Sequence, residues 1–173
     1  MEKVDVIIVG AGVVGLAIAA QVSKQYPNKA VVLLEKWEKF GQETSGRNSE
    51  VIHAGMYYPT GSLKAKLCVH GNSLLYAYCA ANKIAHQRIG KIIITRNAKE
   101  EEAVQEIYEQ GQKNGVTGLR YLTKAEVNEM EPNIFATGAL FSENTGIISS
   151  HELMKALEWQ ATEQGAMLAY AHT

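Results

Sequence analysis

The chain has 173 residues, of which 46% are hydrophobic and 20% charged, and its formal net charge at pH 7 is -1. This length suits one ordinary domain with a core, and the composition is that of a globular protein rather than a disordered one. No block of basic residues appears, so the charge pattern argues against a nucleic acid as partner. The two cysteines, Cys68 and Cys79, form neither a CxxC pair nor a metal-ligand pattern. We expect buried, inert thiols in a reducing compartment, and no metal site.

The N-terminal segment combines a strand, a glycine-rich turn and a helix. Residues 4–9 (VDVIIV) are typical of a strand buried on both faces of a parallel sheet. The run 4–20 also has the apolar character of a signal peptide, but Asp5 and the regularly spaced glycines argue against that interpretation. The glycines follow the pattern GxGxxG over residues 10–15, and the helix that they open ends before Pro27.

A second buried strand, residues 30–34 (AVVLL), is followed directly by Glu35. In a dinucleotide-binding unit, Gly10 makes the tight turn, Gly12 lets the backbone approach a pyrophosphate at the helix N-terminus, and Gly15 allows close helix–strand packing. Glu35 is placed to accept hydrogen bonds from an adenosine ribose, which argues against a cofactor with a 2′-phosphate. The order of these parts predicts a dinucleotide site, and the motif alone does not separate FAD from NAD.

Residues 40–58 raise a question that composition leaves open. The polar segment 40–49 (FGQETSGRNS) is either a second set of phosphate contacts or a solvated loop with hydroxyls that cap a helix. His53, in the following stretch VIHAGMYY, is either a reactive group beside a ligand or a strand-end histidine satisfied by backbone groups.

The rest of the chain alternates helices and strands. Helices are predicted at residues 63–81, 98–114 and 150–164, and strands at residues 92–95, 139–141 and 166–170. The helix at 63–81 is expected to bury a face that contains Leu67 and Leu74. Capping boxes are predicted at Thr123 with Glu126, before a short helix, and at Ser149 with Glu152.

Three stretches together carry a resemblance to a known family: GAGVVG (10–15), ETSGRNSEVIHAGMYY (43–58) and GSLKAKLCVHG (61–71). They resemble the FAD-dependent oxidoreductases of the D-amino-acid-oxidase and glycerol-3-phosphate-dehydrogenase type. The motifs are most similar to those of the L-2-hydroxyglutarate dehydrogenases (oxidases), and the resemblance extends through GKIII (90–94) and TGI (145–147). It covers essentially the whole chain but less than half of such an enzyme.

The resemblance implies an α/β fold: an FAD-binding, Rossmann-like nucleotide domain of the glutathione-reductase type, with an inserted α+β substrate or cap section. The nucleotide domain would comprise residues 1–82 and 146–173, and part of the cap section would comprise residues 83–145. The nucleotide domain would then be incomplete, and the chain truncated at its C-terminus.

The resemblance also implies contacts to FAD, position by position. The expected contacts are Gly10, Gly12, Val14, Gly15, Glu35, Lys36, Thr44, Ser45, Asn48, Ser49, His53, Ala54 and Gly55. Two positions depart from the family pattern, because Glu50 stands where a glycine is expected and Ser149 where an aspartate is expected. Lys64 and Lys66 are interpreted as a solvated helix end, and the main cationic anchors of the substrate are expected outside this chain.

The implied reaction is oxidation of a 2-hydroxy acid, L-2-hydroxyglutarate to 2-oxoglutarate, by hydride transfer to flavin N5 with His53 as the base. An amine or amino-acid oxidase, a glycerol-3-phosphate dehydrogenase, a non-catalytic nucleotide-binding module and an NAD-binding domain are the alternatives. The electron acceptor is left open among oxygen, a quinone and an electron-transfer protein. The expected location is cytoplasmic, with peripheral attachment to the inner face of a membrane if the acceptor is a quinone.

Overall fold

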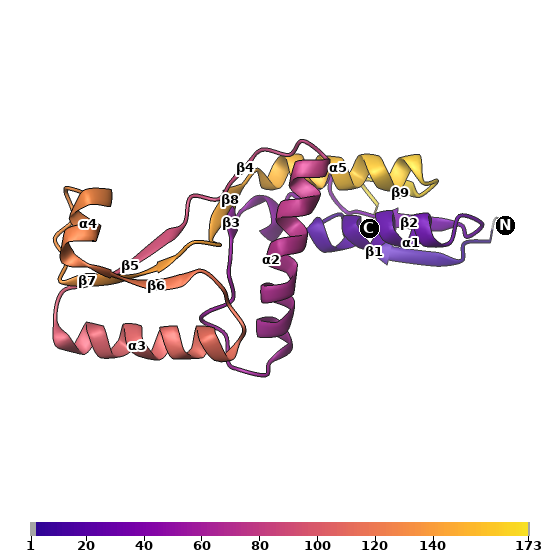
Figure 1. Ribbon diagram of the computed structural model, residues 1–173. Helices are drawn as coiled ribbons and strands as arrows, with labels where there is room; N and C mark the ends of the chain where they lie inside the picture. Colours follow the sequence, from indigo (N-terminus) through magenta and orange to yellow (C-terminus); the bar gives the residue numbers. More distant parts are fainter. Residues whose placement is uncertain (1–2, 173) are drawn as a thin grey trace. The chain divides into compact units, whose positions relative to one another are not determined.

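The computed structural model describes residues 3–172, which form two compact units. The first unit contains residues 3–50, 82–85 and 149–172, and the second contains residues 51–81 and 86–148. Their helices and strands are labelled in Figure 1. The units differ from the predicted domains mainly at residues 51–81, which pack with the later insertion. Because a compact unit is defined by packing and the predicted domains by their role in binding, the domain assignment stays a prediction.

The first unit is built on a parallel sheet with the strand order β1-β2-β9. Helices α1 and α5 pack against each other along one face of this sheet, as Figure 1 shows. They bury Leu16, Ala19 and Leu157 together with strand residues such as Leu33. The elements are β1 (Val6–Val9), α1 (Val13–Gln25), β2 (Val31–Leu34), the 3₁₀ turn η1 (Thr44–Gly46), α5 (Ser150–Glu163) and β9 (Met167–Ala169).

The opposite face of this sheet has no cover within residues 3–172. Ile7 is 60% exposed, Val9 84% and Met167 50%, and the strand register places Ile7, Val32 and Met167 side by side. The prediction of a strand buried on both faces is therefore wrong for the described chain. The physical reason is that α1 and α5 pack on each other and so lie on the same face.

The second unit contains two antiparallel sheets, in the orders β3-β8-β4 and β5-β7-β6. The strands are β3 (Val51–Ile52), β4 (His86–Gln87), β5 (Lys91–Thr95), β6 (Leu119–Thr123), β7 (Gly138–Ser142) and β8 (Gly146–Ile148). The helices are α2 (Leu63–Ala81), α3 (Ala98–Lys113) and α4 (Lys124–Met130). The sequence did not predict β4, β6 or β8, and it predicted β3 only under the interpretation of His53 as a strand-end histidine. Most of these strands have only two or three residues, too few to show an alternating pattern.

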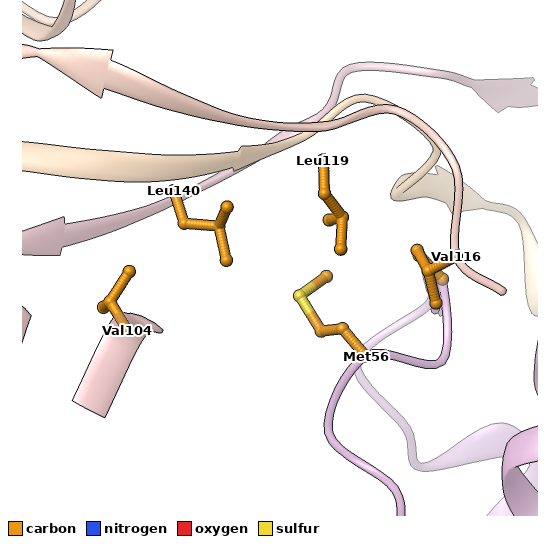
Figure 2. Packing of buried hydrophobic residues seen from close by; sticks show 6 residues of the cluster. Met56, Val104, Val116, Leu119 and Leu140 are labelled. Carbon is orange, nitrogen blue, oxygen red and sulfur yellow. The ribbon is translucent and has the colours of Figure 1, made fainter. Parts of the chain in front are cut away.

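Each face of the β5-β7-β6 sheet has a core of its own. Helix α3 covers one face, where Met56, Val104, Val116, Leu119 and Leu140 pack together, as Figure 2 shows. Helix α4 lies on the other side of the sheet (Figure 1), above a cluster of Leu122, Val127, Ala136 and Ala139. These two layers hold the sheet in place by apolar burial.

Helix α2 is oriented differently from its prediction. Leu67 and Leu74 are 60% and 55% exposed, and the buried positions are Ala65, Asn72, Tyr76 and Cys79. The side chain of Asn72 explains this orientation, because its amide nitrogen donates to the carbonyl oxygens of His53 (3.0 Å) and Asn144 (2.8 Å). A polar anchor therefore outweighs the leucine pattern.

The capping predictions have different outcomes at the two helices. At α4, the reciprocal capping box of Thr123 and Glu126 is confirmed. At α5, the Ser149 hydroxyl accepts from the N–H of Glu152, but the Glu152 carboxylate accepts from the N–H of Ala85 instead of returning to Ser149. The second box is therefore only half formed. In the described part of the chain, no helix is both long and apolar enough to span a membrane.

Candidate functional site

The turn between β1 and α1 depends on glycine for two separate reasons. Gly10 has φ +99°, which a residue with a side chain rarely adopts. A Cβ atom at Gly15 would collide with the carbonyl oxygen of Gly10. The start of α1 therefore lies closely against the end of β1, which is the packing that the third glycine of a dinucleotide-binding turn allows.

The N-terminus of α1 is open to an anion. Its cap residue Gly12 has no side chain to accept a hydrogen bond, and the first turn contains no acidic residue. The hydroxyl of Ser45 accepts from the N–H of Val13 (3.0 Å), which brings the predicted polar segment to the helix end. Because free N–H groups and the helix dipole favour negative charge, this end of α1 fits a phosphate group.

Glu35 lies at the carboxyl end of β2 and is 8% exposed. One carboxylate oxygen accepts from the N–H of Ala11 (2.7 Å) and the other from the N–H of Trp37 (3.0 Å). The acid thus fixes the glycine turn from the neighbouring strand. Each oxygen keeps a lone pair, so the geometry is compatible with ribose hydroxyls as additional donors.

Lys36 forms its contacts with Glu43 and Trp37 and not with the neighbouring Glu35. Its ammonium forms an ion pair with Glu43 (3.2 Å) and lies 4.9 Å from the centre of the Trp37 ring. The hydrogen bonds from Lys36 and Trp37 lower the pKa of the Glu43 carboxyl. Lys36 therefore helps to fix the polar segment, which is a role that its predicted contact with FAD did not include.

The polar segment crosses the N-terminus of α1 and is held there by short bonds. The N–H of Gly41 donates to the carbonyl oxygen of Ala11 (3.0 Å), and the Asn48 amide donates to the carbonyl oxygen of Ser45 (2.7 Å). Thr44 begins the 3₁₀ turn η1. Ser49 and Val14 are exposed. The Ser45 hydroxyl caps the N-terminus of α1, as the interpretation with capping hydroxyls expects, and contacts between this segment and phosphates stay a prediction.

Glu50 occupies an unusual position for a residue with a side chain. Its φ is +53°, in the left-handed region that favours glycine. Its carboxylate accepts from the N–H (2.7 Å) and the hydroxyl (2.8 Å) of Ser150, the first residue of α5. These two bonds lower the pKa of Glu50, with the backbone bond as the main cause. The carboxylate therefore stabilises the start of a helix that is distant in sequence.

A cavity of about 400 Å³ lies between the polar segment and the start of α5. Its lining includes Gly41, Asn48 and Glu50, together with Lys39, Phe40 and His151. The His151 ring packs against the Phe40 ring, with 5.3 Å between ring centres and an angle of 35° between the ring planes. Phe40 belongs to the predicted polar segment, but the sequence did not indicate Lys39 or His151, because no motif connects positions 39 and 151.

His53 lies in the second unit, directly after β3. Its carbonyl oxygen accepts from the Asn72 amide and from the Cys68 thiol (3.5 Å), so its backbone is fixed. The imidazole is exposed and has no hydrogen-bond partner among the described residues. Desolvation lowers its pKa, and the charges of Lys91 and Lys64 lower it further. The neutral imidazole that results is the form that accepts a proton.

The residues after His53 give the chain little freedom. Ala54 is 4% exposed, and Gly55 has φ +100°. A Cβ atom at Gly55 would lie 2.8 Å from a methyl carbon of Val69. The small residues of this segment thus allow α2 to approach closely, whatever else they contact.

A family model described as FAD dependent oxidoreductase, DAO, matches residues 5–173. The chain belongs to this FAD-dependent oxidoreductase family. This membership argues against the alternative of an NAD-binding domain. The prediction of the family from the residues of segments 10–15, 43–58 and 61–71 is confirmed.

Two curated relatives show the degree of similarity. The chain is 44% identical over 156 residues to the mitochondrial L-2-hydroxyglutarate dehydrogenase of Arabidopsis thaliana, which covers 90% of this chain and 32% of that protein. It is 37% identical over 161 residues to the human mitochondrial enzyme of the same name, covering 93% of this chain and 35% of that protein. The chain thus spans about a third of the length of these relatives.

Solved structures have the same fold. L-alpha-glycerophosphate oxidase from Mycoplasma pneumoniae, with FAD bound, superimposes with a TM-score of 0.90 at 29% identity, over 99% of this chain and 45% of that one. Glycine oxidase from Geobacillus kaustophilus gives a TM-score of 0.85 at 26% identity, over 99% of this chain and 47% of that one. The predicted α/β flavoprotein fold is therefore confirmed.

Proposed function

We propose that this chain provides the FAD-binding turn and the catalytic base of an enzyme that oxidises L-2-hydroxyglutarate to 2-oxoglutarate. The observation that carries this proposal is the occurrence of an open glycine turn and an exposed, neutral His53 in a chain 44% identical to an L-2-hydroxyglutarate dehydrogenase. The assignments of residues 1–82 and 146–173 to FAD binding, and of 83–145 to substrate covering, belong to the same proposal.

Each residue in the proposed site has a defined task. Gly10, Gly12 and Gly15 admit the pyrophosphate of FAD, the Glu35 carboxylate accepts from the adenosine ribose, and Ser45 and Asn48 hold the second segment against the phosphates. Bound FAD supplies the acceptor for the hydride from C2 of the substrate. The Nδ1 or Nε2 lone pair of neutral His53 takes the proton from the C2 hydroxyl, so that the carbonyl forms.

A second candidate is an oxidase of glycerol 3-phosphate. The observation that favours it is the TM-score of 0.90 with the glycerophosphate oxidase structure. The chemistry at the hydroxyl carbon is the same, so His53 would keep its task. The two candidates differ in the anion that the enzyme recognises, a carboxylate or a phosphate.

Anaerobic flavin spectroscopy separates these candidates. The protein is loaded with FAD and mixed in turn with L-2-hydroxyglutarate, D-2-hydroxyglutarate, glycerol 3-phosphate and glycine. Bleaching of the visible flavin bands by L-2-hydroxyglutarate alone supports the proposal, and bleaching by glycerol 3-phosphate supports the second candidate. Bound flavin that no substrate bleaches, in a protein that photoreduction does bleach, would contradict both.

The electron acceptor is proposed to be oxygen, a quinone or an electron-transfer protein. Mixing the reduced enzyme with each acceptor and following the return of the flavin bands distinguishes them. A cytoplasmic location, with attachment to a membrane surface if a quinone is the acceptor, remains part of the proposal. Fractionation of cells that express the protein tests it.

A further inference from the structure

Two lysine side chains from different elements lie over the tyrosines that follow His53. The ammonium of Lys64, in the first turn of α2, is 4.4 Å from the centre of the Tyr58 ring. The ammonium of Lys91, the first residue of β5, is 4.7 Å from the centre of the Tyr57 ring. Because the tyrosines are consecutive, the fold gathers two cations at one short segment of the second unit.

The described residues do not neutralise this positive charge. The ion pairs found between residues 3 and 172 join Lys29 to Asp5, Lys36 to Glu43 and Arg120 to Glu126, and none includes Lys64 or Lys91. Helix α2 contains no acidic residue. A tyrosine ring attracts an ammonium more weakly than a carboxylate does, so both lysines keep the capacity to bind an anion.

The charges of these lysines reach His53. Desolvation is the main reason that the pKa of His53 is lowered, and Lys91 and then Lys64 are the further causes. The lysines are therefore close enough to act on the proposed base. An anion bound between them would remove part of this effect.

We propose that Lys64 and Lys91, held on the rings of Tyr58 and Tyr57, bind one carboxylate of the substrate beside His53. This proposal rests on the proposed function, because it assumes a 2-hydroxy dicarboxylate. It replaces the interpretation of Lys64 as a solvated helix end, and it places cationic anchors within this chain. The bound carboxylate orients the C2 hydroxyl toward the imidazole, and its charge makes His53 a stronger base when the substrate is present.

Binding of glutarate tests this site without turnover, because glutarate has both carboxylates but no hydroxyl to oxidise. Its affinity is measured by calorimetry on the FAD-loaded protein, as wild type and as the variants Lys64→Gln, Lys91→Gln and Lys66→Gln. Lys66 is the matched control, because it lies in the same turn of α2 as Lys64 and has no ring contact among those found. The first two variants are expected to weaken binding about tenfold or more, the loss of one charged hydrogen bond. Equal affinities in all four proteins would overturn the proposal.

The pKa of His53, followed by NMR of its ring protons, is a second readout that a purely structural role would not change. Lys64→Gln and Lys91→Gln are each expected to raise this pKa in the absence of ligand. Glutarate is expected to raise it in the wild type and in Lys66→Gln, and less in the other two variants. A His53 pKa that responds to glutarate equally in all four proteins would also overturn the proposal.

Failure of the proposed function would give a different experimental result from failure of the lysine site. In that case L-2-hydroxyglutarate bleaches the flavin of none of the four proteins. The glutarate affinities and the His53 titrations are still measured, and they report on the lysine site alone.

Discussion

Gly15 shows how closely a single residue controls the cofactor turn. Its missing side chain leaves space for the carbonyl oxygen of Gly10, and this contact sets the distance between α1 and β1. Gly71, in the interior of α2, has the opposite environment, since a Cβ atom there would have no neighbour within 4 Å. The two glycines therefore have different reasons to be glycine.

Gly15→Ala is expected to reduce the free energy of unfolding by about 1–3 kcal/mol, because the added methyl group forces the helix away from the strand. The control Gly71→Ala is expected to stabilise α2 by about 0.5–1 kcal/mol, since it lowers the backbone entropy lost on folding. Urea unfolding of both variants, with an FAD titration, measures these effects. An unchanged stability and FAD affinity in Gly15→Ala would contradict the packing argument.

His53 predicts a pH dependence for the reaction. Its pKa lies below the ordinary value of 6.5, so the neutral base is present at lower pH than usual. The rate of flavin reduction at low substrate concentration should rise with pH, with a midpoint below 6.5. In His53→Asn, this rise of the rate with pH should be absent, and the rate should fall by about 10²–10⁴-fold. A midpoint above 6.5 in the wild type would argue against His53 as the base.

At the scale of single residues, the sequence predicted those that belong to a local motif. The tight turn at Gly10 and the close packing at Gly15 have the geometry that the motif predicts, whereas the contacts of Gly12, Glu35 and Ser45 with FAD stay predictions. The bond from Ser150 to Glu50 and the approach of Lys91 to Tyr57 were not predicted, because each joins residues far apart in sequence. No period or spacing in the chain indicates such contacts.

At the scale of elements, α5 depends on two other segments for its first turn. The Ser149 hydroxyl accepts a hydrogen bond from the N–H of Glu152, and the Glu50 carboxylate accepts one from the N–H of Ser150. The Glu152 carboxylate accepts a hydrogen bond from the N–H of Ala85. Glu50 and Ser149 are the two departures from the family pattern. The Glu50 carboxylate lies at the start of α5, where its negative charge interacts favourably with the helix dipole, and the Ser149 hydroxyl caps the same turn.

Glu50→Gln is expected to lower the melting temperature at neutral pH, because an amide replaces the charged acceptor of two hydrogen bonds. The folded state lowers the pKa of Glu50, so the stabilisation is present above the pKa of the unfolded chain and is lost as the pH falls through the lower folded value. The difference between wild type and variant should therefore disappear in acid. Glu106→Gln, on an exposed face of α3, is the control and should show no such pattern.

At the scale of the whole chain, the bare face of the β1-β2-β9 sheet is an exposed apolar surface of the first unit. Ile7, Val9 and Met167 lie on this face. The hydrophobic run of β1 was predicted from the sequence, but its environment was not. A run of apolar residues shows that a strand is suited to burial and does not show how many layers cover it.

The chain is expected to self-associate through this face at micromolar concentrations, because a contiguous apolar surface beside the edge strand β1 favours pairing. Ile7→Lys should shift the equilibrium toward monomer. Ile89→Lys, at an apolar residue of similar exposure in the second unit, should not. Sedimentation velocity over a range of concentrations measures the effect, and a wild type that stays monomeric throughout would refute it.

The interruption of the first unit by the second has a consequence for synthesis on the ribosome. Strands β1 and β2 are translated first, but β9, which pairs with the second edge of β2, emerges only after residues 51–148. The second unit has all of its strands once β8 is translated, so it can finish folding while the nucleotide-binding sheet still has an open edge. Nascent chains halted between β8 and β9 would then present one open edge of β2, and these are the chains that a chaperone would be expected to hold.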